Sequence, residues 1–525
     1  MRKEKKRRLP IGGVQTFSNL RKNYDVYVDK TEYVHEMVSY YKAVFLSRPR
    51  RFGKSLLCST IESLFRGERE LFEGLYISET DWEWKEHPVI HLELAGRNYT
   101  VNGADVLINT LNSQLDTVCD EYGLSVEPSV FVDNRFAGII LALYKKNGPV
   151  VVVVDEYDSP LLSTLNCQET NQKIREILKG FYGVSKQNDR YLRFVFVTGV
   201  TKFAQVSVFS GFNQPKDISM ASEYSDICGI NHDELEKYFA PEIDAFAPKH
   251  GGREAYLEKL KMFYDGYCFT EDFVAVYNTY GMLNHFDSAG RFAPFWSMSG
   301  EPSFMRKYLE SKRVDIVDIE TAVMRASDFA DYRDDNITLF PLLYQAGYLT
   351  IAGYDELTGF YKLSYPNVEI RQSLAVFLSK NYLEAEDVIS KSTSAGLVRA
   401  LLSGDAEGFM ELLNPYLARV DYSLSSKITE YYFEFAVSNI INMLGLECRT
   451  EVHTSHGRMD CVILAGDYIY IFEFKVDKPL EDAIGQLAEK DYALIYADRG
   501  KKPVEIGVVF SRETRNVVEW GVRIH

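Results

Sequence analysis

The sequence predicts an α/β protein built from several domains, with a mostly parallel sheet at the front, a helical middle and a second α/β unit at the back. Its 525 residues are too many for one core and correspond to roughly three domains. Residues 10–235 alternate between β-rich apolar runs and helical patterns, which is typical of parallel strands joined by helices. The next stretch is rich in Tyr and Phe and helical in spacing, and strands return after residue 425. We therefore expect domains at residues 1–235, 236–400 and 401–525.

The overall composition excludes some classes of protein. A net charge of −16 and a pI of about 5.2 argue against a strongly basic nucleic-acid coat protein, although a local basic site remains compatible with an acidic body. No stretch approaches 18 uninterrupted apolar residues, so we expect no membrane partner. The seven cysteines are dispersed and form no CxxC pair, which argues against zinc and favours reduced thiols in the cytoplasm.

The first motif lies between an apolar run and a helical pattern that begins at Ser55. Here Gly53-Lys54-Ser55 matches the second half of the phosphate-binding pattern GxxxxGK[ST], whereas Arg48 stands where the pattern has its first Gly. Backbone N–H groups at the helix start would face the phosphates, Lys54 would reach the β- and γ-phosphates, and the Ser55 hydroxyl would ligate Mg²⁺. The expected nucleotide contacts in this loop are Arg51, Phe52, Gly53, Lys54 and Ser55.

A second motif about a hundred residues later supports the first. Val150–Val154 is an unbroken β-branched run, as expected of a strand buried on both faces, and it ends in Asp155 and Glu156. Asp155 would hold Mg²⁺ and Glu156 would polarise the attacking water as a catalytic residue. Thr198, at the end of a further strand, is a candidate sensor of the γ-phosphate, and a Thr that caps the next turn explains it equally well. Together these motifs predict a P-loop NTPase that binds ATP and Mg²⁺.

The middle of the chain contains one recognisable pattern. Residues 339–351 read as a helix that leads into a strand, 353–359 as a turn, and 360–363 as a returning strand. A helix followed by a β-hairpin is compatible with a winged-helix module.

The C-terminal part carries a separate chemical signal. Two strand patterns are separated by Gly466-Asp467, a two-residue turn that sets the pairing so that partner numbers sum to 933. Asp460 then falls opposite Glu473, and Lys475 shares the face of Glu473. Facing carboxylates are unfavourable unless a cation offsets their repulsion. We therefore expect Asp460 and Glu473, and also the Phe474 carbonyl, to ligate Mg²⁺ or Mn²⁺, with Lys475 stabilising phosphate charge or orienting the attacking water.

This arrangement resembles the D…(E)xK site of the PD-(D/E)xK nucleases, and an α/β fold like that of restriction endonucleases is what the resemblance implies. That family usually adds a carboxylate from the preceding helix. Residues 427–444 have a helical pattern that contains Glu430 and Glu434, and Glu430 fits the family position as a third metal ligand. On the helix after the ExK strand, Gln486 fits a recurrent accessory position, and Tyr492 is a weaker candidate.

A resemblance also covers most of the chain. The segments that carry it are Tyr27–Thr31, Phe45–Ser55, Val154–Asp158 and Phe196–Phe203, which look like the AAA-ATPase-like family. Its members carry a nuclease-type C-terminal domain, and Arg at position 48 in place of Gly is usual among them. One of Arg48, Arg50 and Arg51 either helps to bind nucleotide or, in a homo-oligomer, faces a neighbouring subunit.

Two functions remain open from the sequence. In the first, ATP binding or hydrolysis controls metal-dependent cleavage of nucleic acid, with DNA the first choice of partner. In the second, ATP is a conformational ligand of a STAND-like switch, and the C-terminal domain binds DNA or another partner without cutting. The catalytic residues expected in the first reading are Glu156, Asp460, Glu473 and Lys475.

Overall fold

The computed structural model divides into two compact units, one formed by residues 1–311 with 321–367 and one by 368–525 with 312–320. Each unit is described by itself. The residues that the structure describes are 7–202, 215–298, 322–329, 339–382, 391–417, 430–454, 457–493, 496, 501–514 and 516–524.

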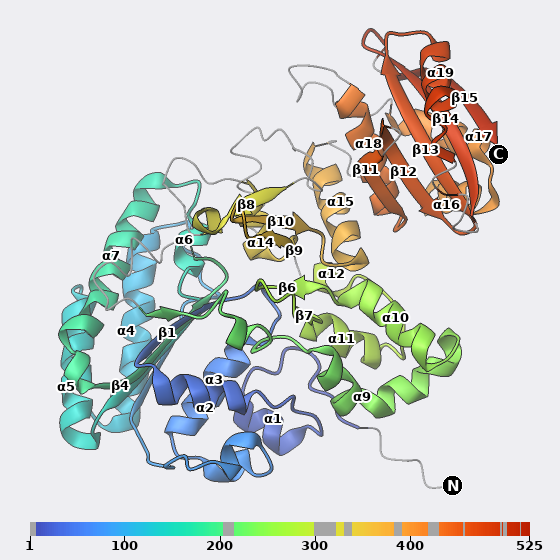
Figure 1. The fold of residues 1–525 in the computed structure, drawn as a ribbon. Helices are drawn as coiled ribbons and strands as arrows, with labels where there is room; N and C mark the ends of the chain where they lie inside the picture. Colours follow the sequence, from blue (N-terminus) through green and yellow to red (C-terminus); the bar gives the residue numbers. More distant parts are fainter. Residues whose placement is uncertain are drawn as a thin grey trace. The chain divides into compact units, whose positions relative to one another are not determined.

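The front unit is built on a five-stranded sheet in the order β2-β3-β4-β1-β5, and every pairing in it is parallel (Figure 1). Strand β3 (Val150–Asp155) is buried at every position, as the unbroken valine run predicts. In this order β4 lies between β1 and β3. Because the strands are parallel, the carboxyl ends of β1 and β3 lie at the same edge of the sheet, with one strand between them. The strands are β1 (Ala43–Ser47), β2 (Val89–Glu93), β3 (Val150–Asp155), β4 (Leu192–Gly199) and β5 (Lys216–Asp217).

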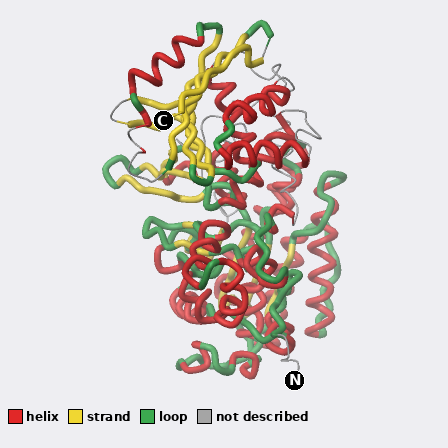
Figure 2. Tube along the Cα trace, turned by 90° about the vertical axis from the view of Figure 1, so that its right-hand side faces the viewer, coloured by secondary structure: helices red, strands yellow, loops and turns green. Residues whose placement is uncertain are grey.

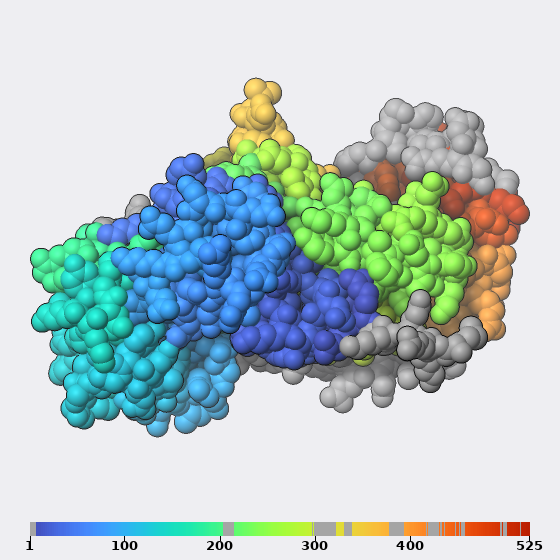
Figure 3. Space-filling model, turned by 90° about the horizontal axis from the view of Figure 1, so that it is seen from below, coloured from blue at the N-terminus to red at the C-terminus, as the bar shows by residue number. Residues whose placement is uncertain are grey.

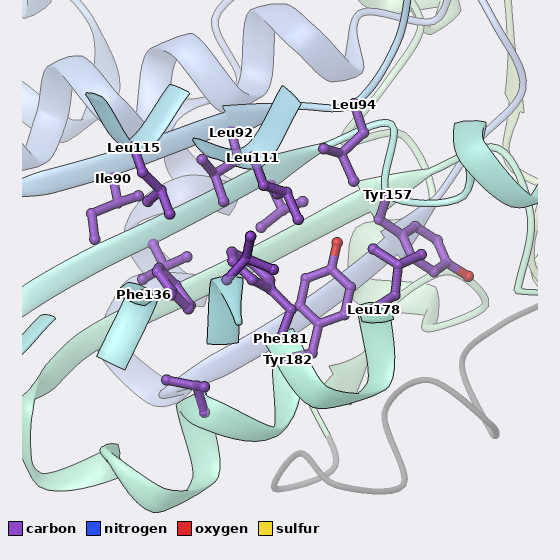
Figure 4. Packing of buried hydrophobic residues seen from close by; sticks show 14 of the residues in the cluster. Ile90, Leu92, Leu94, Leu111, Leu115, Phe136, Tyr157, Leu178, Phe181 and Tyr182 are labelled. Carbon is purple, nitrogen blue, oxygen red and sulfur yellow. The ribbon is translucent and has the colours of Figure 1, made fainter. Parts of the chain in front are cut away.

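Helices cover both faces of this sheet. The alternate residues of β3, Val150, Val152 and Val154, belong to a core shared with three long helices on one face. In this core the rings of Phe136 and Phe181 stack at 4.3 Å between centroids (Figure 4). The helix that follows β1 contacts β3 from the other face. The helices of this region are α1 (Phe17–Asn23), α2 (Thr31–Tyr40), α3 (Lys54–Phe65), α4 (Gly103–Tyr122), α5 (Val132–Asn147), α6 (Ser159–Ser163) and α7 (Gln168–Gln187).

The helices after residue 230 pack onto the N-terminal segment rather than forming a compact unit of their own. Leu9 and Val26 share a core with Leu235, Tyr256 and Met282. In Figure 3 the dark blue N-terminal surface lies directly against the green surface of these helices. The expected boundary at residue 235 therefore does not separate two compact units. The helices are α9 (His232–Phe246), α10 (Arg253–Tyr264), α11 (Thr279–Asp287) and α12 (Phe295–Met298), with the short strands β6 (Tyr267–Cys268) and β7 (Ala275–Val276).

The helix and hairpin expected in the middle of the chain are present. Residues 339–346 form α14 (Leu339–Ala346), and a three-stranded antiparallel sheet follows the order β8-β10-β9. The turn of the hairpin is shorter than expected, because β9 continues to Asp355. The strands are β8 (Val323–Arg325), β9 (Thr350–Asp355) and β10 (Phe360–Ser364).

The second unit places a five-stranded sheet between helices (Figure 2). Its strands follow chain order from β11 to β15, and all pairs are antiparallel except β13 with β14. That parallel pair requires a crossover, which α19 supplies. The elements are α15 (Val368–Tyr382), α16 (Lys391–Ser403), α17 (Ala406–Leu417), α18 (Glu430–Met443), β11 (Glu447–Thr454), β12 (Gly457–Ala465), β13 (Tyr468–Val476), α19 (Leu480–Lys490), β14 (Lys502–Ser511) and β15 (Asn516–Ile524).

Across the described ranges of both units, no helix combines the length and the apolar character needed to cross a membrane.

Candidate functional site

The loop between β1 and α3 presents a lysine at the start of a helix. Gly53 has a φ of +96°, a conformation that favours glycine, and α3 begins at Lys54. The Lys54 side chain is 4% exposed, and its Nζ donates to the Pro49 carbonyl at 3.1 Å. The same Nζ lies 3.9 Å from Glu156 Oε1. The ammonium is therefore held between the loop backbone and a carboxylate, beside the N–H groups of the helix start.

Asp155 and Glu156 lie at the end of β3, as the sequence predicts. The buried Asp155 carboxyl is hydrogen-bonded by Ser55, and burial, with the neighbouring charge of Glu156, raises its pKa. A serine hydroxyl and a carboxylate in contact form a pair of oxygen ligands of the kind that Mg²⁺ prefers. Glu156 adopts a φ of +53°, which is uncommon for a residue with a Cβ atom and is found most often at functional sites.

A pocket of about 350 Å³ opens over Gly53, Lys54 and Ser55. One wall is the N-terminal segment 10–15, and another is the face of α11 that carries residues 279–284. The sequence did not single out α11, because the contact joins segments more than two hundred residues apart. The pocket is large enough for a ligand the size of a small cofactor.

The side chains of Arg51 and Phe52 lie in different surroundings, one at the pocket and one in the core. Arg51 lines the pocket with a φ of +71°, and its guanidinium lies 4.8 Å from the centre of the Tyr280 ring on α11. Phe52 is 1% exposed and packs its ring against Tyr267 and Phe269. Of Phe52, only the backbone is therefore available to a nucleotide.

Arg48 has a structural role that explains why the pattern lacks its first glycine. The side chain is 2% exposed, and burial lowers the pKa of its guanidinium. Nη1 donates to the Ser219 carbonyl at 2.7 Å and Nη2 to the Tyr224 carbonyl at 3.0 Å. The guanidinium also lies 4.3 Å from the centre of the Phe269 ring. The Arg48 hydrogen bonds thus connect the loop between β1 and α3 to residues 219–225.

Thr198 does not present its hydroxyl to the pocket. It is fully buried, and its Oγ1 donates to the Leu46 carbonyl on the neighbouring strand β1 at 2.7 Å. This bond favours a structural role, although it spans two strands instead of capping the next turn. The carboxylate that organises this region is Asp158, for which the sequence predicted no role of its own. It is fully buried and accepts hydrogen bonds from Val200 N at 3.2 Å and Thr201 N at 2.7 Å, and burial raises its pKa to about 6.

In the second unit the expected hairpin and its register are confirmed. Gly466 and Asp467 form the turn, with Gly466 at φ +55°. The pairs run from Ala465 with Tyr468 to Cys461 with Phe472, all with sums of 933. Among the described residues the pairing of β12 with β13 ends there, while β12 remains paired with β11 and β13 with β14. The sheet therefore divides at the level of Asp460.

Asp460, Glu473 and Lys475 meet at this division. The Phe474 N–H, which lies beyond the ladder with β12, donates to Asp460 Oδ2 at 2.8 Å. Lys475 Nζ donates to Glu473 Oε1 at 2.5 Å and to the Phe474 carbonyl at 3.2 Å. As whole residues, Asp460, Glu473 and Lys475 are 8%, 1% and 8% exposed, respectively. Burial raises the pKa of Asp460 and of Glu473, and their mutual repulsion raises that of Glu473 further.

Two features of this site fit a divalent cation. Glu473 Oε2 is buried and has no hydrogen-bond partner within the described part of the chain, although such atoms are costly to leave unsatisfied. The Lys475 ammonium contacts Glu473 Oε1 and the Phe474 carbonyl, two of the oxygens expected as ligands, so the site already accommodates positive charge. Oxygen donors of this kind suit Mg²⁺ or Mn²⁺.

The third expected ligand is not in place. Glu430, the first residue of α18, lies 3.4 Å from the ammonium of Lys478. No group of three or more His, Cys, Asp or Glu side chains surrounds one cation position in the described ranges. The two candidate accessory residues contact each other: Gln486 hydrogen-bonds Tyr492, and the Tyr492 hydroxyl donates at 2.7 Å to the carbonyl of Arg458, which lies on the same strand as Asp460.

Comparisons with known proteins match two segments of the chain. A family model described as predicted AAA-ATPase matches residues 10–209, and one described as PD-(D/E)XK nuclease superfamily matches residues 428–520. An uncharacterized protein in the vnfD 5′ region of Azotobacter chroococcum mcd 1 is 34% identical over 529 residues, covering 98% of each chain. The chain belongs to the predicted AAA-ATPase family. In this AAA-ATPase family member, Lys54, Asp155 and Glu156 lie inside the first matched segment, whereas α11 lies outside it. Asp460, Glu473 and Lys475 lie inside the second, and the relative spans both segments.

One solved structure also matches this family member. It is the Aeropyrum pernix ORC2 protein in ADPNP–ADP complexes, with 11% identity, a TM-score of 0.27, and coverage of 80% of this chain and 85% of that one. A likeness at that level carries no argument about this chain. The front unit of the AAA-ATPase family member is an α/β P-loop domain, and its C-terminal sheet domain is of the PD-(D/E)XK nuclease superfamily.

Proposed function

We propose that this protein binds and hydrolyses ATP in its front unit and cleaves nucleic-acid phosphodiester bonds with a divalent cation in its C-terminal unit. The observation that carries the cleavage half is the buried, unsatisfied Glu473 Oε2 beside Asp460 and Lys475. A protein that needed these side chains only for folding would gain by replacing them, because buried like charges are costly.

In the front unit each residue has a defined task. Lys54 gives up its contacts with the Pro49 carbonyl and Glu156 and binds the phosphates that enter the pocket. Glu156, thereby released from the ammonium, accepts a proton from the attacking water. Ser55 and Asp155 would hold Mg²⁺, directly and through water respectively.

In the C-terminal unit Asp460 and Glu473 would hold Mg²⁺ or Mn²⁺. When bound, such a cation stabilises negative charge on a phosphodiester and lowers the pKa of bound water. Lys475 turns its ammonium from Glu473 toward the phosphate and stabilises the charge that develops there. Tyr492 positions the start of β12 through the Arg458 carbonyl, and so keeps Asp460 beside Glu473.

The test is cleavage of plasmid DNA, single-stranded DNA and RNA with Mg²⁺ or Mn²⁺. Lys475→Ala should lose at least about a hundredfold in rate, the size of effect seen when a charge-stabilising donor is removed from an active site. Lys501→Ala is the matched control, because Lys501 Nζ donates to the Gly466 carbonyl at the hairpin turn, away from Asp460. Equal rates for the two variants would remove the nuclease assignment.

A second function is favoured by the state of Glu430 and Thr198. With Glu430 paired to Lys478, the described carboxylates do not form a three-ligand cation site, and the Thr198 hydroxyl is occupied within the sheet. In this alternative ATP is a conformational ligand of a STAND-like switch, and the C-terminal unit binds DNA or another partner without cutting. ATP binding without hydrolysis, together with DNA binding without cleavage, would select it.

A further inference from the structure

An exposed ion pair lies at the edge of the buried carboxylate site. Glu430 begins α18, and Lys478 stands two residues beyond the end of β13. The two side chains meet at 3.4 Å between Lys478 Nζ and Glu430 Oε1. After burial and nearer contacts, the charge of Glu430 also contributes to the raised pKa values of Asp460 and Glu473. Its carboxylate is therefore within electrostatic reach of the position where a cation would be held.

This pair is easily broken. The side chains retain 51% exposure for Lys478 and 42% for Glu430, whereas the Lys475–Glu473 pair retains only 10% and 1%. A solvent-exposed ion pair of this kind changes an equilibrium constant by about fivefold at most. Either partner can therefore be exchanged for a competing charge at small cost.

A cation held by Asp460 and Glu473 would need further oxygen donors. Asp460 Oδ2 already accepts a hydrogen bond from the Phe474 N–H. Not every oxygen of the two carboxylates is therefore available to a cation. Mg²⁺ and Mn²⁺ sites are built from several oxygen ligands, and a third carboxylate would strengthen this one. Glu430 has the right charge and lies nearby, but Lys478 holds it.

We propose that Lys478 keeps Glu430 off the cation site until the phosphate backbone of a nucleic acid takes Lys478. Glu430 then turns onto the cation held by Asp460 and Glu473. The inference rests on the proposed cleavage function and adds an order to it: backbone contact comes first, and the carboxylate set is completed second. The protein with nucleic acid bound then has a higher affinity for the divalent cation than the free protein has. By reciprocal linkage, the protein with the cation bound has a higher affinity for nucleic acid.

The first experiment measures Mn²⁺ affinity of the full-length protein by electron paramagnetic resonance of free Mn²⁺, without nucleic acid. Lys478→Gln should bind Mn²⁺ about three- to fivefold more tightly than wild type, because Glu430 is released. Lys501→Gln removes the same charge at the far end of β13 and should show no such gain. Adding Glu430→Gln to Lys478→Gln should abolish the gain. A gain equal to that of Lys501→Gln, or one that survives Glu430→Gln, overturns the inference.

The second experiment tests the backbone contact. A labelled DNA duplex and an RNA duplex of the same sequence are titrated in EDTA, where no cleavage occurs, over a range of salt concentrations. Loss of one phosphate contact lowers the slope of log affinity against log salt by about one. Lys478→Gln should show this decrease for the duplex that the protein binds, and Lys501→Gln should not. An unchanged slope in Lys478→Gln contradicts the proposal.

The outcomes separate this inference from the function on which it rests. If wild type binds Mn²⁺ and cleaves nucleic acid while Lys478→Gln behaves as Lys501→Gln does, only the role of the Glu430–Lys478 pair is wrong. If neither wild type nor any variant binds Mn²⁺, the proposed cleavage function falls with it.

Discussion

Arg48 Nη1 lies 2.7 Å from the carbonyl oxygen of Ser219, inside the protein and away from the nucleotide pocket. Arg48, which replaces the first glycine of the P-loop pattern, is thus a buried residue whose hydrogen bonds stabilise the loop. The loop before Lys54 is held in place by a charged side chain, whose hydrogen bonds to carbonyl oxygens are stronger than neutral ones.

Restoring the glycine should therefore damage the protein. Arg48→Gly removes the buried donors and leaves the Ser219 and Tyr224 carbonyls without this partner, at a cost of about 3 kcal/mol or more. Urea unfolding followed by tryptophan fluorescence measures it, since Trp82, Trp84 and Trp296 all lie in the front unit. Arg51→Gly is the control, because the φ of +71° there suits glycine. Equal stability of the two variants would refute this role of Arg48.

Two substitutions at the proposed nucleotide site should have different effects on ATP binding and on ATP hydrolysis. Lys54→Ala should weaken ATP affinity by about thirtyfold or more, because a buried ammonium beside the phosphates is lost. Glu156→Gln should keep ATP affinity within a few-fold and lose hydrolysis. Calorimetric titration and phosphate release measure the two effects, with Lys173→Ala, an exposed lysine of α7, as control. If Lys54→Ala binds ATP as wild type does, the pocket is not the nucleotide site.

The cation site makes a prediction about stability. Without divalent cation, Asp460→Asn should cost the C-terminal unit little stability, because the Asn amide oxygen can still accept the Phe474 N–H and the repulsion from Glu473 is removed. With millimolar Mg²⁺, wild type should gain stability according to its affinity, while Asp460→Asn gains little. Thermal unfolding with Mg²⁺ and with EDTA checks this. A similar Mg²⁺ effect in both proteins would place the cation elsewhere.

A buried histidine gives the front unit a pH dependence. His285 is fully buried, its Nδ1 donates to the Arg291 carbonyl at 3.0 Å, and Nε2 accepts from the Tyr256 hydroxyl at 2.6 Å. Burial lowers its pKa from 6.5 to about 4. The unfolded chain therefore takes up the proton first, and stability is lost as pH falls from about 6.5 toward 4.

This loss amounts to about 1.4 kcal/mol for each unit of pKa difference, on the order of 3–4 kcal/mol in all. His285→Asn should be less stable at neutral pH but should lose less on acidification. Urea unfolding between pH 7 and 4.5 measures the two slopes, with His232→Asn at a half-exposed position as control. Parallel slopes for wild type and His285→Asn would contradict the assignment.

Sequence reasoning succeeded where local rules determine geometry. The turn Gly466-Asp467 fixes the register of its hairpin as far as Cys461 with Phe472, so the sequence alone places Asp460 and Glu473 one step beyond the last pair. The valine run from Val150 likewise identifies a buried strand by composition alone.

The rest depended on contacts between distant segments. Nothing local to Arg48 shows that its partners are carbonyls some 170 residues away, and nothing local to Tyr280 shows that α11 walls the nucleotide pocket. Thr198 ends a strand as predicted, but only the strand order reveals that its hydroxyl reaches Leu46. For Glu430, the helix pattern gave the position, whereas the competing partner Lys478 came from a loop after another strand.

The central claim is a proposal that follows the first of the two functions considered from the sequence: nucleotide in the front unit controls cleavage in the C-terminal unit. Its most direct test is the rate of DNA cleavage with Mg²⁺ in the presence and absence of ATP, for wild type, Lys54→Ala and Lys475→Ala. We predict that ATP changes the wild-type rate, that Lys54→Ala keeps a basal rate with no response to ATP, and that Lys475→Ala does not cleave in either condition. Cleavage by Lys475→Ala at the wild-type rate, or an undiminished ATP response in Lys54→Ala, would contradict the account.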